Sequence, residues 1–268
     1  MIKGRENPQD VKRRENLEQI HYKIAVMSGK GGVGKSSVSV NLAWALALQD
    51  LSVGLMDADI HGPNVPKMLG IEDIGFTGEQ DAIEPVEVLP NLKIASVGNI
   101  GYNADQALIW RGPMKIGLIR QFLSDVVWGE LDYMIVDTPP GTGDEALTIG
   151  QDMKPLTGIV IVTTPQDVAV LDSRKSVNFA EQMEIPVIGI IENMADGEQF
   201  QIFGSGGGEQ AAQELGVPFL GRVALDPRMV SAGDQGRPYV ALHGEEEAGR
   251  QLFSIVDKIT TYCKGVSG

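Results

Sequence analysis

Residues Gly29 to Ser36 read GKGGVGKS and fit the pattern G-x-x-x-x-G-K-[ST] of a phosphate-binding loop. The stretch follows the apolar run YKIAVMS (residues 22–28) and precedes a helical pattern over residues 36–49. In this strand–loop–helix context, glycines bring backbone N–H groups close to phosphate oxygens, and the helix N-terminus adds its dipole. We therefore expect a nucleotide site here; the alternative is a glycine-rich turn that binds no ligand.

The residue types inside the loop predict individual roles. Lys35 is the cation expected at the β- and γ-phosphates, and the Ser36 hydroxyl is an expected Mg²⁺ ligand. Lys30 is a second lysine, and phosphate electrostatics alone does not require it. The nucleotide-binding residues predicted from the motif are Gly29, Lys30, Gly31, Gly32, Val33, Gly34, Lys35, Ser36 and Ser37.

Apolar, β-branched runs alternate with helical patterns from about residue 22 to the end of the chain. The predicted strands are 22–28, 52–57, 92–98, 133–138, 158–164, 186–192 and 217–223, and the predicted helices are 36–49, 113–127, 144–153, 168–183, 208–215 and 245–262. Such alternation predicts one α/β domain over residues 21–268, with a mostly parallel, twisted sheet of about seven or eight strands and helices on both faces. Residues 71–90 are predicted to be a surface insertion, and a short hairpin is one structure that it could adopt.

Charge and composition restrict the partners. The net charge of the 268-residue chain is −14, which argues against nucleic acid as the main partner, because such proteins cluster Lys and Arg. No apolar run reaches the ~18 residues of a membrane span. We therefore expect a protein that binds no membrane. The lone Cys263 excludes an intrachain disulfide and fits a reducing compartment, so we expect a cytoplasmic location.

Residues 1–20 form a charged N-terminal arm without the apolar segment of a secretory signal. We interpret this arm as solvated or as a short helix that precedes the domain. Its VKRR stretch (residues 11–14) could instead contact an anionic partner.

Two acidic segments follow predicted strands. In GLMDADIHGPNVP (residues 54–66), Asp57 and Asp59 share one side of an extended chain at the carboxyl edge of the sheet, where ligands of open sheets bind. One carboxylate can orient the attacking water and the other can support the Mg²⁺ shell. The alternative role is a helix N-cap.

In YMIVDTPPGTGDE (residues 133–145), an apolar run ends in Asp137, which is predicted to lie beside Mg²⁺, usually through a water. The PPGTG that follows is predicted to approach the γ-phosphate and to move when that phosphate leaves. Prolines and glycines by themselves would indicate only a tight turn.

Two later segments are candidates for the nucleoside pocket. Asn193 stands at the end of the predicted strand 186–192, where its amide can read the adenine edge, and the GSGGGE run after it is either a second anion-binding turn or a mobile loop. In LDPRMVSAGDQGRP (residues 225–238), Asp226 and Arg228 are predicted to line the base or ribose pocket.

Taken together, these motifs resemble a known family. KGGVGKS resembles the deviant Walker A motif of the MinD/ParA/nitrogenase-iron-protein superfamily, and DADIHGPNVP, VDTPPGTGDE, TTPQDVAVLDSRK, IENM…IFGSGGGE and LDPRMVSAGDQGRP resemble the Mrp/ApbC branch. Members of that branch are ATPases of iron–sulfur cluster assembly. The resemblance covers about nine-tenths of the chain.

The resemblance implies an ATP-gated homodimer. In relatives, the lysine that corresponds to Lys30 reaches across the dimer to the partner's nucleotide, so Lys30 would stabilise transferred charge in trans, as an arginine finger does. Lys35 would bind phosphate in cis, Asp59 would orient the attacking water, and Asp137 with Ser36 would surround Mg²⁺. The catalytic residues implied are therefore Lys30, Lys35 and Asp59, and the metal-site residues are Ser36, Asp57, Asp59 and Asp137.

One departure from the family concerns the cargo. Cluster-carrying members place C-x-x-C between the Asn-Met and the Phe-Gly of the segment that reads IENM…IFGSGGGE here, whereas this chain has ADGEQFQI (residues 195–202) at that place. A dimer offers two thiols, one Cys263 per copy, against the usual four for a [4Fe–4S] cluster. The position of Cys263 fits a small helix-face hydrophobe, so the cysteine count does not support a cluster held by this chain.

Three functions remain open from the sequence. The first is an ATPase that hydrolyses ATP slowly and serves iron–sulfur or metal-cofactor assembly, with a client protein supplying the missing ligands. The second is a positioning ATPase of the MinD or ParA kind, against which the acidic charge and the cation-poor tail (residues 248–268) argue. The third is a nucleotide-gated adaptor with negligible turnover.

Overall fold

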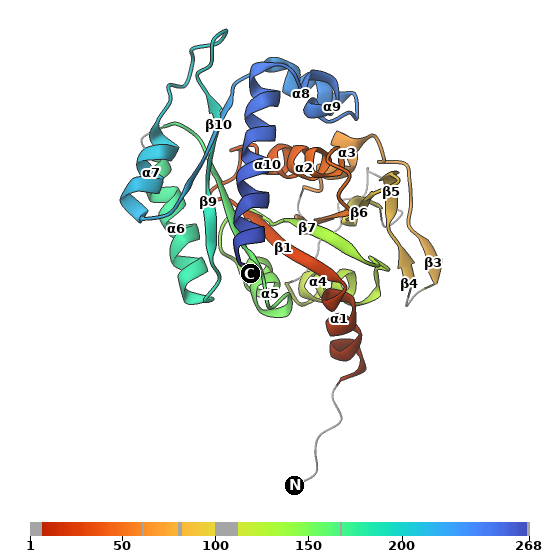
Figure 1. The fold of residues 1–268 in the computed structure, drawn as a ribbon. Helices are drawn as coiled ribbons and strands as arrows, with labels where there is room; N and C mark the ends of the chain where they lie inside the picture. The colour runs from red at the N-terminus through yellow and green to blue at the C-terminus, as the bar shows by residue number, and fades with distance from the viewer. Residues whose placement is uncertain (1–6, 61, 80–81, 100–111, 167, 267–268) are drawn as a thin grey trace.

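An eight-stranded twisted sheet forms the centre of the computed structural model, which describes residues 7–60, 62–79, 82–99, 112–166 and 168–266 (Figure 1). The strand order is β10-β9-β8-β1-β7-β2-β6-β5, and neighbours pair in parallel except β5, which is antiparallel to β6. The sheet strands are β1 (Ile20–Met27), β2 (Val53–Asp57), β5 (Val86–Leu89), β6 (Leu92–Ser96), β7 (Leu131–Asp137), β8 (Gly158–Thr163), β9 (Val187–Ala195) and β10 (Phe219–Ala224). The predicted fold class is confirmed.

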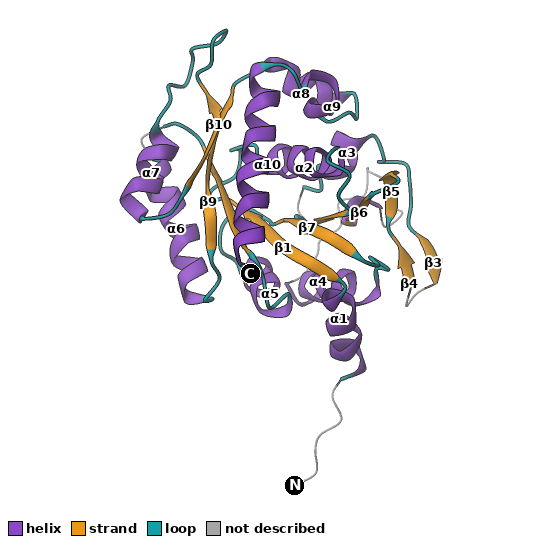
Figure 2. Cartoon of the chain, in the orientation of Figure 1, coloured by secondary structure: helices purple, strands orange, loops and turns teal. Residues whose placement is uncertain are grey.

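Helices cover both faces of this sheet (Figure 2). The helices on one face are α2 (Lys35–Ala47), α3 (Val65–Leu69), α8 (Pro227–Asp234), α9 (Tyr239–His243) and α10 (Glu247–Val266). Those on the other are α1 (Pro8–Glu18), α4 (Gly112–Asp125), α5 (Asp144–Asp152), α6 (Ala169–Gln182) and α7 (Gly207–Leu215). Side chains alternate between the faces, so Ile24 and Val26 join one core cluster and Ala25 and Met27 join the other. Burial on both sides explains the nearly continuous apolar runs.

The described part of the N-terminal arm is a packed helix. Asn7 caps α1 by accepting a hydrogen bond from the Gln9 N–H, and Leu17 is buried. The Asn16 amide donates to the carbonyls of Leu123, Ser124 and Val126 at the C-terminal end of α4, at 3.3, 3.0 and 2.9 Å. These bonds satisfy helix-end carbonyls that would otherwise lack a partner, which fixes α1 against the domain.

The predicted insertion at residues 71–90 contains the hairpin that the sequence suggested. Strands β3 (Thr77–Glu79) and β4 (Ala82–Glu84) pair antiparallel outside the main sheet. Strand β5 then joins the edge of the main sheet, a pairing that the sequence did not predict. A short 3₁₀ helix (Val97–Asn99) follows β6.

The C-terminal helix α10 packs its apolar face onto the sheet. Leu252, Ile255 and Ile259 are buried there, and Cys263 has no exposed surface. Burial raises the pKa of the Cys263 thiol to about 12, so it remains a neutral thiol. This confirms the interpretation of Cys263 as a core side chain. None of the helices in the described residues is both long and apolar enough to cross a membrane.

Candidate active site

The phosphate-binding loop joins the carboxyl end of β1 to the first turn of α2. Gly32 and Gly34 have φ angles of 81° and 80°, in the left-handed region that favours glycine. Gly29 is required for another reason, because a Cβ there would lie 2.0 Å from the carbonyl oxygen of Asp172 on α6. The loop conformation therefore depends on its glycines, as the motif predicted.

A buried ionic cluster lies directly beneath the loop. The Lys35 ammonium is 2.6 Å from Asp137 Oδ1, and the Ser39 hydroxyl donates to the same oxygen at 2.7 Å. All three side chains are buried. The cluster forms because β1 and β2 both pair with β7, which brings the loop and the two strand-end aspartates to one edge of the sheet.

Asp57 lies beside this cluster, in register with Asp137 on the neighbouring strand. It is fully buried, and its carboxyl accepts hydrogen bonds from the Ser96 hydroxyl at 2.8 Å and the Asp59 N–H at 3.1 Å. Burial, reinforced by the nearby charge of Asp137, raises the pKa of Asp57 to about 8. At neutral pH Asp57 is therefore mainly a neutral carboxyl, and the predicted metal role would require it to lose that proton.

The donor set beneath the loop fits Mg²⁺. Asp137 Oδ1 is occupied by Lys35 and Ser39, whereas Asp137 Oδ2 is buried without a hydrogen-bond partner among the described residues. Ser36 is half-buried at the start of α2, with its hydroxyl 3.5 Å from the Lys35 ammonium. A carboxylate oxygen and a hydroxyl at a phosphate site are ligands that Mg²⁺ prefers.

Asp59 and the PPGTG loop lie at the mouth of the site. Asp59 is half-buried and lines an open cavity with Asn64, Pro139, Pro140 and Glu145. The Gly141 N–H donates to the Ser28 carbonyl at 2.8 Å, so the predicted switch loop contacts the start of the phosphate-binding loop. The structure thus places Asp59 near the loop that was predicted to sense the γ-phosphate.

Lys30 makes an ion pair within its own chain. Its ammonium lies 3.0 Å from Asp172 Oδ2 in the first turn of α6. The Ser28 hydroxyl also donates to the Lys30 carbonyl, at 2.9 Å. With 35% of its side chain exposed, Lys30 keeps access to the surface of the loop.

A pocket of about 270 Å³ opens beside the end of the phosphate-binding loop. It is lined mainly by Gly34, Ser37, Val40, Asn193, Met194, Leu225, Asp226, Met229 and Tyr239. The Asn193 amide donates to the Val33 carbonyl at 2.9 Å, which links β9 to the loop. Strand β9 continues to Ala195, so Asn193 lies inside the strand, and its predicted position at the strand end is wrong.

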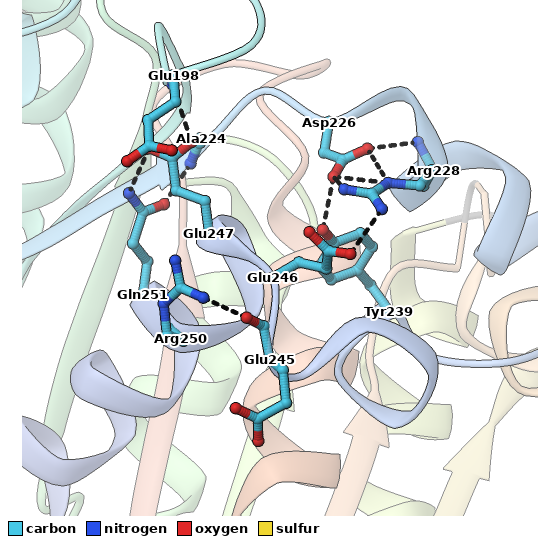
Figure 3. Close-up of polar contacts among 10 residues, drawn as sticks. All are labelled: Glu198, Ala224, Asp226, Arg228, Tyr239, Glu245, Glu246, Glu247, Arg250 and Gln251. Carbon is cyan, nitrogen blue, oxygen red and sulfur yellow. Dashed lines mark hydrogen bonds and ion pairs between the residues drawn. The ribbon is translucent and has the colours of Figure 1, made fainter.

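Asp226 contributes to this pocket, but its carboxylate is already engaged (Figure 3). It caps α8 by accepting from the Arg228 N–H at 2.8 Å and also accepts from the Arg228 guanidinium and, at 2.6 Å, the Tyr239 hydroxyl. Although burial opposes ionisation, these hydrogen bonds lower the pKa of Asp226 to about 2. Arg228 pairs with Glu246 and is not part of the pocket lining.

The glycine run after β9 is an anion-binding turn, and its anion is Glu192 of the same chain. The buried carboxylate accepts from the Gly206 N–H at 2.9 and 3.1 Å and from the Gly208 N–H at 2.5 Å, at the start of α7. A Cβ on Gly208 would lie 2.7 Å from Glu192 Cβ, so the turn needs glycine there. The turn therefore binds an anion, but that anion is a side chain of the same chain and not a ligand.

Several residues of the site were not singled out in the sequence. Ser39 lies one helical turn after Lys35, a spacing that puts both on one face of α2. Ser96 ends the strand beside β2, and Glu192 is a charge inside an apolar run, which is a signal for a buried anion. Asp172 gave no local signal, since its partner Lys30 is distant in the sequence.

Comparison with known proteins places these features in a family. The sequence profile of ParA-type NUBPL iron-transfer P-loop NTPases matches residues 19–260. The chain is 51% identical over 259 residues to an iron–sulfur cluster carrier protein of Methanocaldococcus jannaschii, covering 94% of this chain and 89% of that protein. A carrier protein of the same name from Methanococcus maripaludis is 48% identical, with 94% and 90% coverage.

Solved structures agree with the fold. A nucleotide-binding protein of Archaeoglobus fulgidus in complex with ADP is 38% identical, with a TM-score of 0.74 over 85% of this chain and 91% of that one. The septum site-determining protein MinD of Pyrococcus horikoshii, complexed with Mg-ADP, has a TM-score of 0.69 over 92% and 98% of the two chains. At 21% identity, the MinD structure supports the fold alone.

Proposed function

This chain belongs to the ParA-type family of NUBPL iron-transfer P-loop NTPases, and on that premise we propose that it is a Mg²⁺-dependent ATPase acting as an ATP-gated homodimer in iron–sulfur or metal-cofactor assembly. The observation that carries the proposal is the buried cluster of Lys35, Ser39 and Asp137 beneath the loop. Asp137 Oδ2 has no hydrogen-bond partner among the described residues, so this oxygen is available to a metal ion or its bound water. The slow turnover and the cytoplasmic location are part of the same proposal.

Four residues of the site have distinct roles in this proposal. Lys35 has three N–H donors, so it can contact phosphate while the Asp137 carboxylate holds it at the loop. Ser36 and Asp137 would hold Mg²⁺, which supplies charge neutralisation at the β- and γ-phosphates. Asp59, at the mouth of the site, would orient the attacking water through its carboxylate.

Lys30 is proposed to act on the nucleotide of a second copy of the chain. Its ion pair with Asp172 holds the ammonium at the exposed side of the loop. In a face-to-face dimer, exchange of that carboxylate for a partner's phosphate would deliver positive charge where negative charge develops. Hydrolysis would then depend on dimer geometry.

The pocket beside the loop is the proposed nucleoside site. Its wall of Met194, Leu225 and Met229 is apolar, as a base pocket requires. Asn193 offers an amide at the inner end of this wall. Asp226 is proposed to shape the pocket through its contacts with Arg228 and Tyr239.

The cargo is proposed to be held jointly with a client protein. Cys263 is buried in α10, far along the chain from the segment that carries C-x-x-C in cluster-binding members. Among the described residues, no group of three or more His, Cys, Asp or Glu side chains is placed to hold a metal ion. A client that supplies thiolates would complete the ligand set.

Phosphate release from Mg-ATP, measured over hours with and without EDTA, tests the proposal. Metal-dependent release whose rate per subunit rises with protein concentration supports a dimeric ATPase. Binding of ATP without phosphate release would instead identify a nucleotide-gated adaptor. Anaerobic reconstitution with iron and sulfide tests the cargo: a stoichiometric cluster on this chain alone would contradict the joint-ligand proposal. ATP-dependent co-sedimentation with liposomes or DNA would instead indicate a positioning ATPase.

A further inference from the structure

Residues 196–204, between β9 and α7, form a loop that stands out from the carboxyl edge of the sheet (Figure 1). We name it the tip loop. It occupies the interval where the sequence ADGEQFQI replaces C-x-x-C.

The tip loop is held together by one carboxylate. Asp196 accepts hydrogen bonds from the N–H groups of Ile202 and Phe203, at 2.7 and 2.8 Å. The Asp196 N–H donates to the Gly204 carbonyl at 2.8 Å, which closes the base of the loop. Although burial opposes it, these and the other backbone N–H contacts lower the pKa of Asp196, so the carboxylate stays charged.

Helix α10 anchors the loop from the other side (Figure 3). The Glu198 N–H donates to Glu247 Oε2 at 2.9 Å. Gly197 packs so closely that a Cβ would lie 2.8 Å from both Glu247 Oε2 and Ala224 Cβ. Glu247 in turn accepts from Gln251, which accepts from the Ala224 N–H at 2.7 Å. The loop conformation is therefore specified by contacts at both ends.

This framework presents two large apolar side chains to solvent. Ile202 is 64% exposed and Phe203 is 44% exposed. Their backbone N–H groups face Asp196. Adjacent exposed apolar residues on a fixed loop are typical of a contact surface.

The charge around the tip indicates the chemistry of the partner. The tip loop itself carries Asp196 and Glu198 and contains no Lys, Arg or His. Arg228 and Arg250 line a small cavity beside Glu198, so they offset part of this acidic charge. Glu245, Glu246 and Glu247 follow at the start of α10, near the anchor of the loop. A second copy of this acidic surface, or an anionic membrane, would meet like charge.

We propose that the tip loop is a docking element for a protein whose binding surface has an apolar patch surrounded by Lys and Arg. Ile202 and Phe203 would enter the patch, and the surrounding carboxylates would pair with its basic rim. This proposal rests on the proposed function in one respect, because it takes the docked protein to be the client proposed there. The docking surface itself does not require hydrolysis.

The tip loop is also connected to the nucleoside pocket. The Leu225 N–H donates to the Ala195 carbonyl at 2.8 Å, directly before the loop, and Leu225 lines the pocket. Ala224, which packs against Gly197, lines the same pocket. Docking and nucleotide binding thus share one wall.

The test uses a defined probe, a fluorescein-labelled amphipathic peptide of about 18 residues, with leucine on one helical face and lysine on the other. Its affinity is measured by fluorescence anisotropy for the wild-type chain and for the double variant Ile202→Ser with Phe203→Ser. The matched control is Leu48→Ser with Val266→Ser, which removes two exposed apolar side chains elsewhere, at 51% and 56% exposure. A peptide with glutamate in place of lysine tests the charge requirement.

The proposal predicts that the tip-loop variant binds the lysine peptide at least tenfold more weakly, that the control variant binds within about twofold of wild type, and that the glutamate peptide does not bind. Equal binding by the tip-loop variant and wild type contradicts the proposal, as does absence of binding by wild type. A loss of dimerisation in the tip-loop variant without a change in peptide affinity also contradicts it, by making a second copy the occupant. Loop-dependent binding in a chain that does not hydrolyse ATP supports the docking site and contradicts only the proposed function.

Discussion

The Lys30 ammonium lies 3.0 Å from the Asp172 carboxylate, so the lysine assigned to a partner's nucleotide is paired within its own chain. The same residue of α6 places its carbonyl oxygen against Gly29. Because the pair is partly exposed, it is worth about 0.5–1 kcal/mol. That is small enough for a partner's phosphate to replace the carboxylate.

Asp172→Asn should therefore favour the trans contact. If the cis pair competes with dimer formation, the protein concentration at half-maximal specific ATPase activity should fall about threefold, the factor that corresponds to roughly 0.6 kcal/mol. Phosphate release measured over a dilution series checks this. Glu181→Gln, an exposed change on the same helix, is the control. An unchanged or higher half-maximal concentration would show that Asp172 does not restrain Lys30.

The Lys35–Asp137 pair should be a large stability determinant, since both side chains are buried. Asp137→Asn would leave the ammonium without its counter-charge and should lower the free energy of unfolding by about 3–5 kcal/mol. Lys35→Met in the Asp137→Asn background should recover part of that loss. Urea unfolding of the two single variants and the double variant measures the coupling. A cost below about 1 kcal/mol, or no recovery, contradicts this account of the cluster.

The sequence predicted the architecture well because local patterns determine most of it. Local sequence patterns identify the glycine-rich loop, the strand before it and Asp137 at the end of β7. The parallel topology then brings these features together. Strand ends differed by a few residues, as with β9, which continues past Asn193 to Ala195.

The contacts that could not be predicted join residues far apart in the chain. Lys30 with Asp172 and Glu192 with Gly206 depend on how helices and loops pack, and no periodicity encodes that. The edge pairing of β5 with β6 has the same origin. Local pattern identified the nucleotide site, whereas its restraints became visible only in the structure.

Asp57 should make stability depend on pH. Below its ordinary pKa of 3.8 the carboxyl is neutral in both states; between that value and about 8, the folded chain keeps a proton that the unfolded chain releases. Stability should therefore fall as pH rises through this window. Asp57→Asn removes the titration, so thermal unfolding from pH 5 to 8.5 should show a flatter Tm profile. The difference in Tm between the variant and the wild type should grow by about 10 °C toward the alkaline end. Parallel profiles would contradict the raised pKa.

Glu192 should hold the glycine turn against β9. In Glu192→Gln, the neutral amide is a weaker acceptor for the Gly206 and Gly208 N–H groups and should destabilise the fold by about 2 kcal/mol. Hydrogen exchange of residues 204–209 should accelerate, whereas exchange in α4 should not change. Glu214→Gln on α7, exposed to solvent, serves as the control. Unaltered protection of the turn would mean that Glu192 does not organise it.

The central claim is that Lys30 completes the active site of the other subunit, and subunit mixing tests it most directly. Lys30→Ala should retain ATP binding and lose hydrolysis, whereas Lys35→Ala should lose ATP binding. In a mixed dimer, the Lys30→Ala subunit holds ATP through its own Lys35, and the Lys35→Ala subunit supplies the missing Lys30.

Phosphate release from an equimolar mixture of these two inactive variants is the deciding measurement. If Lys30 acts in trans, activity should return to roughly a quarter of wild type, because half of the dimers carry one complete site of two. If Lys30 acts only in cis, neither subunit of the mixed dimer has a complete site, and an inactive mixture in which mixed dimers have formed would contradict the account.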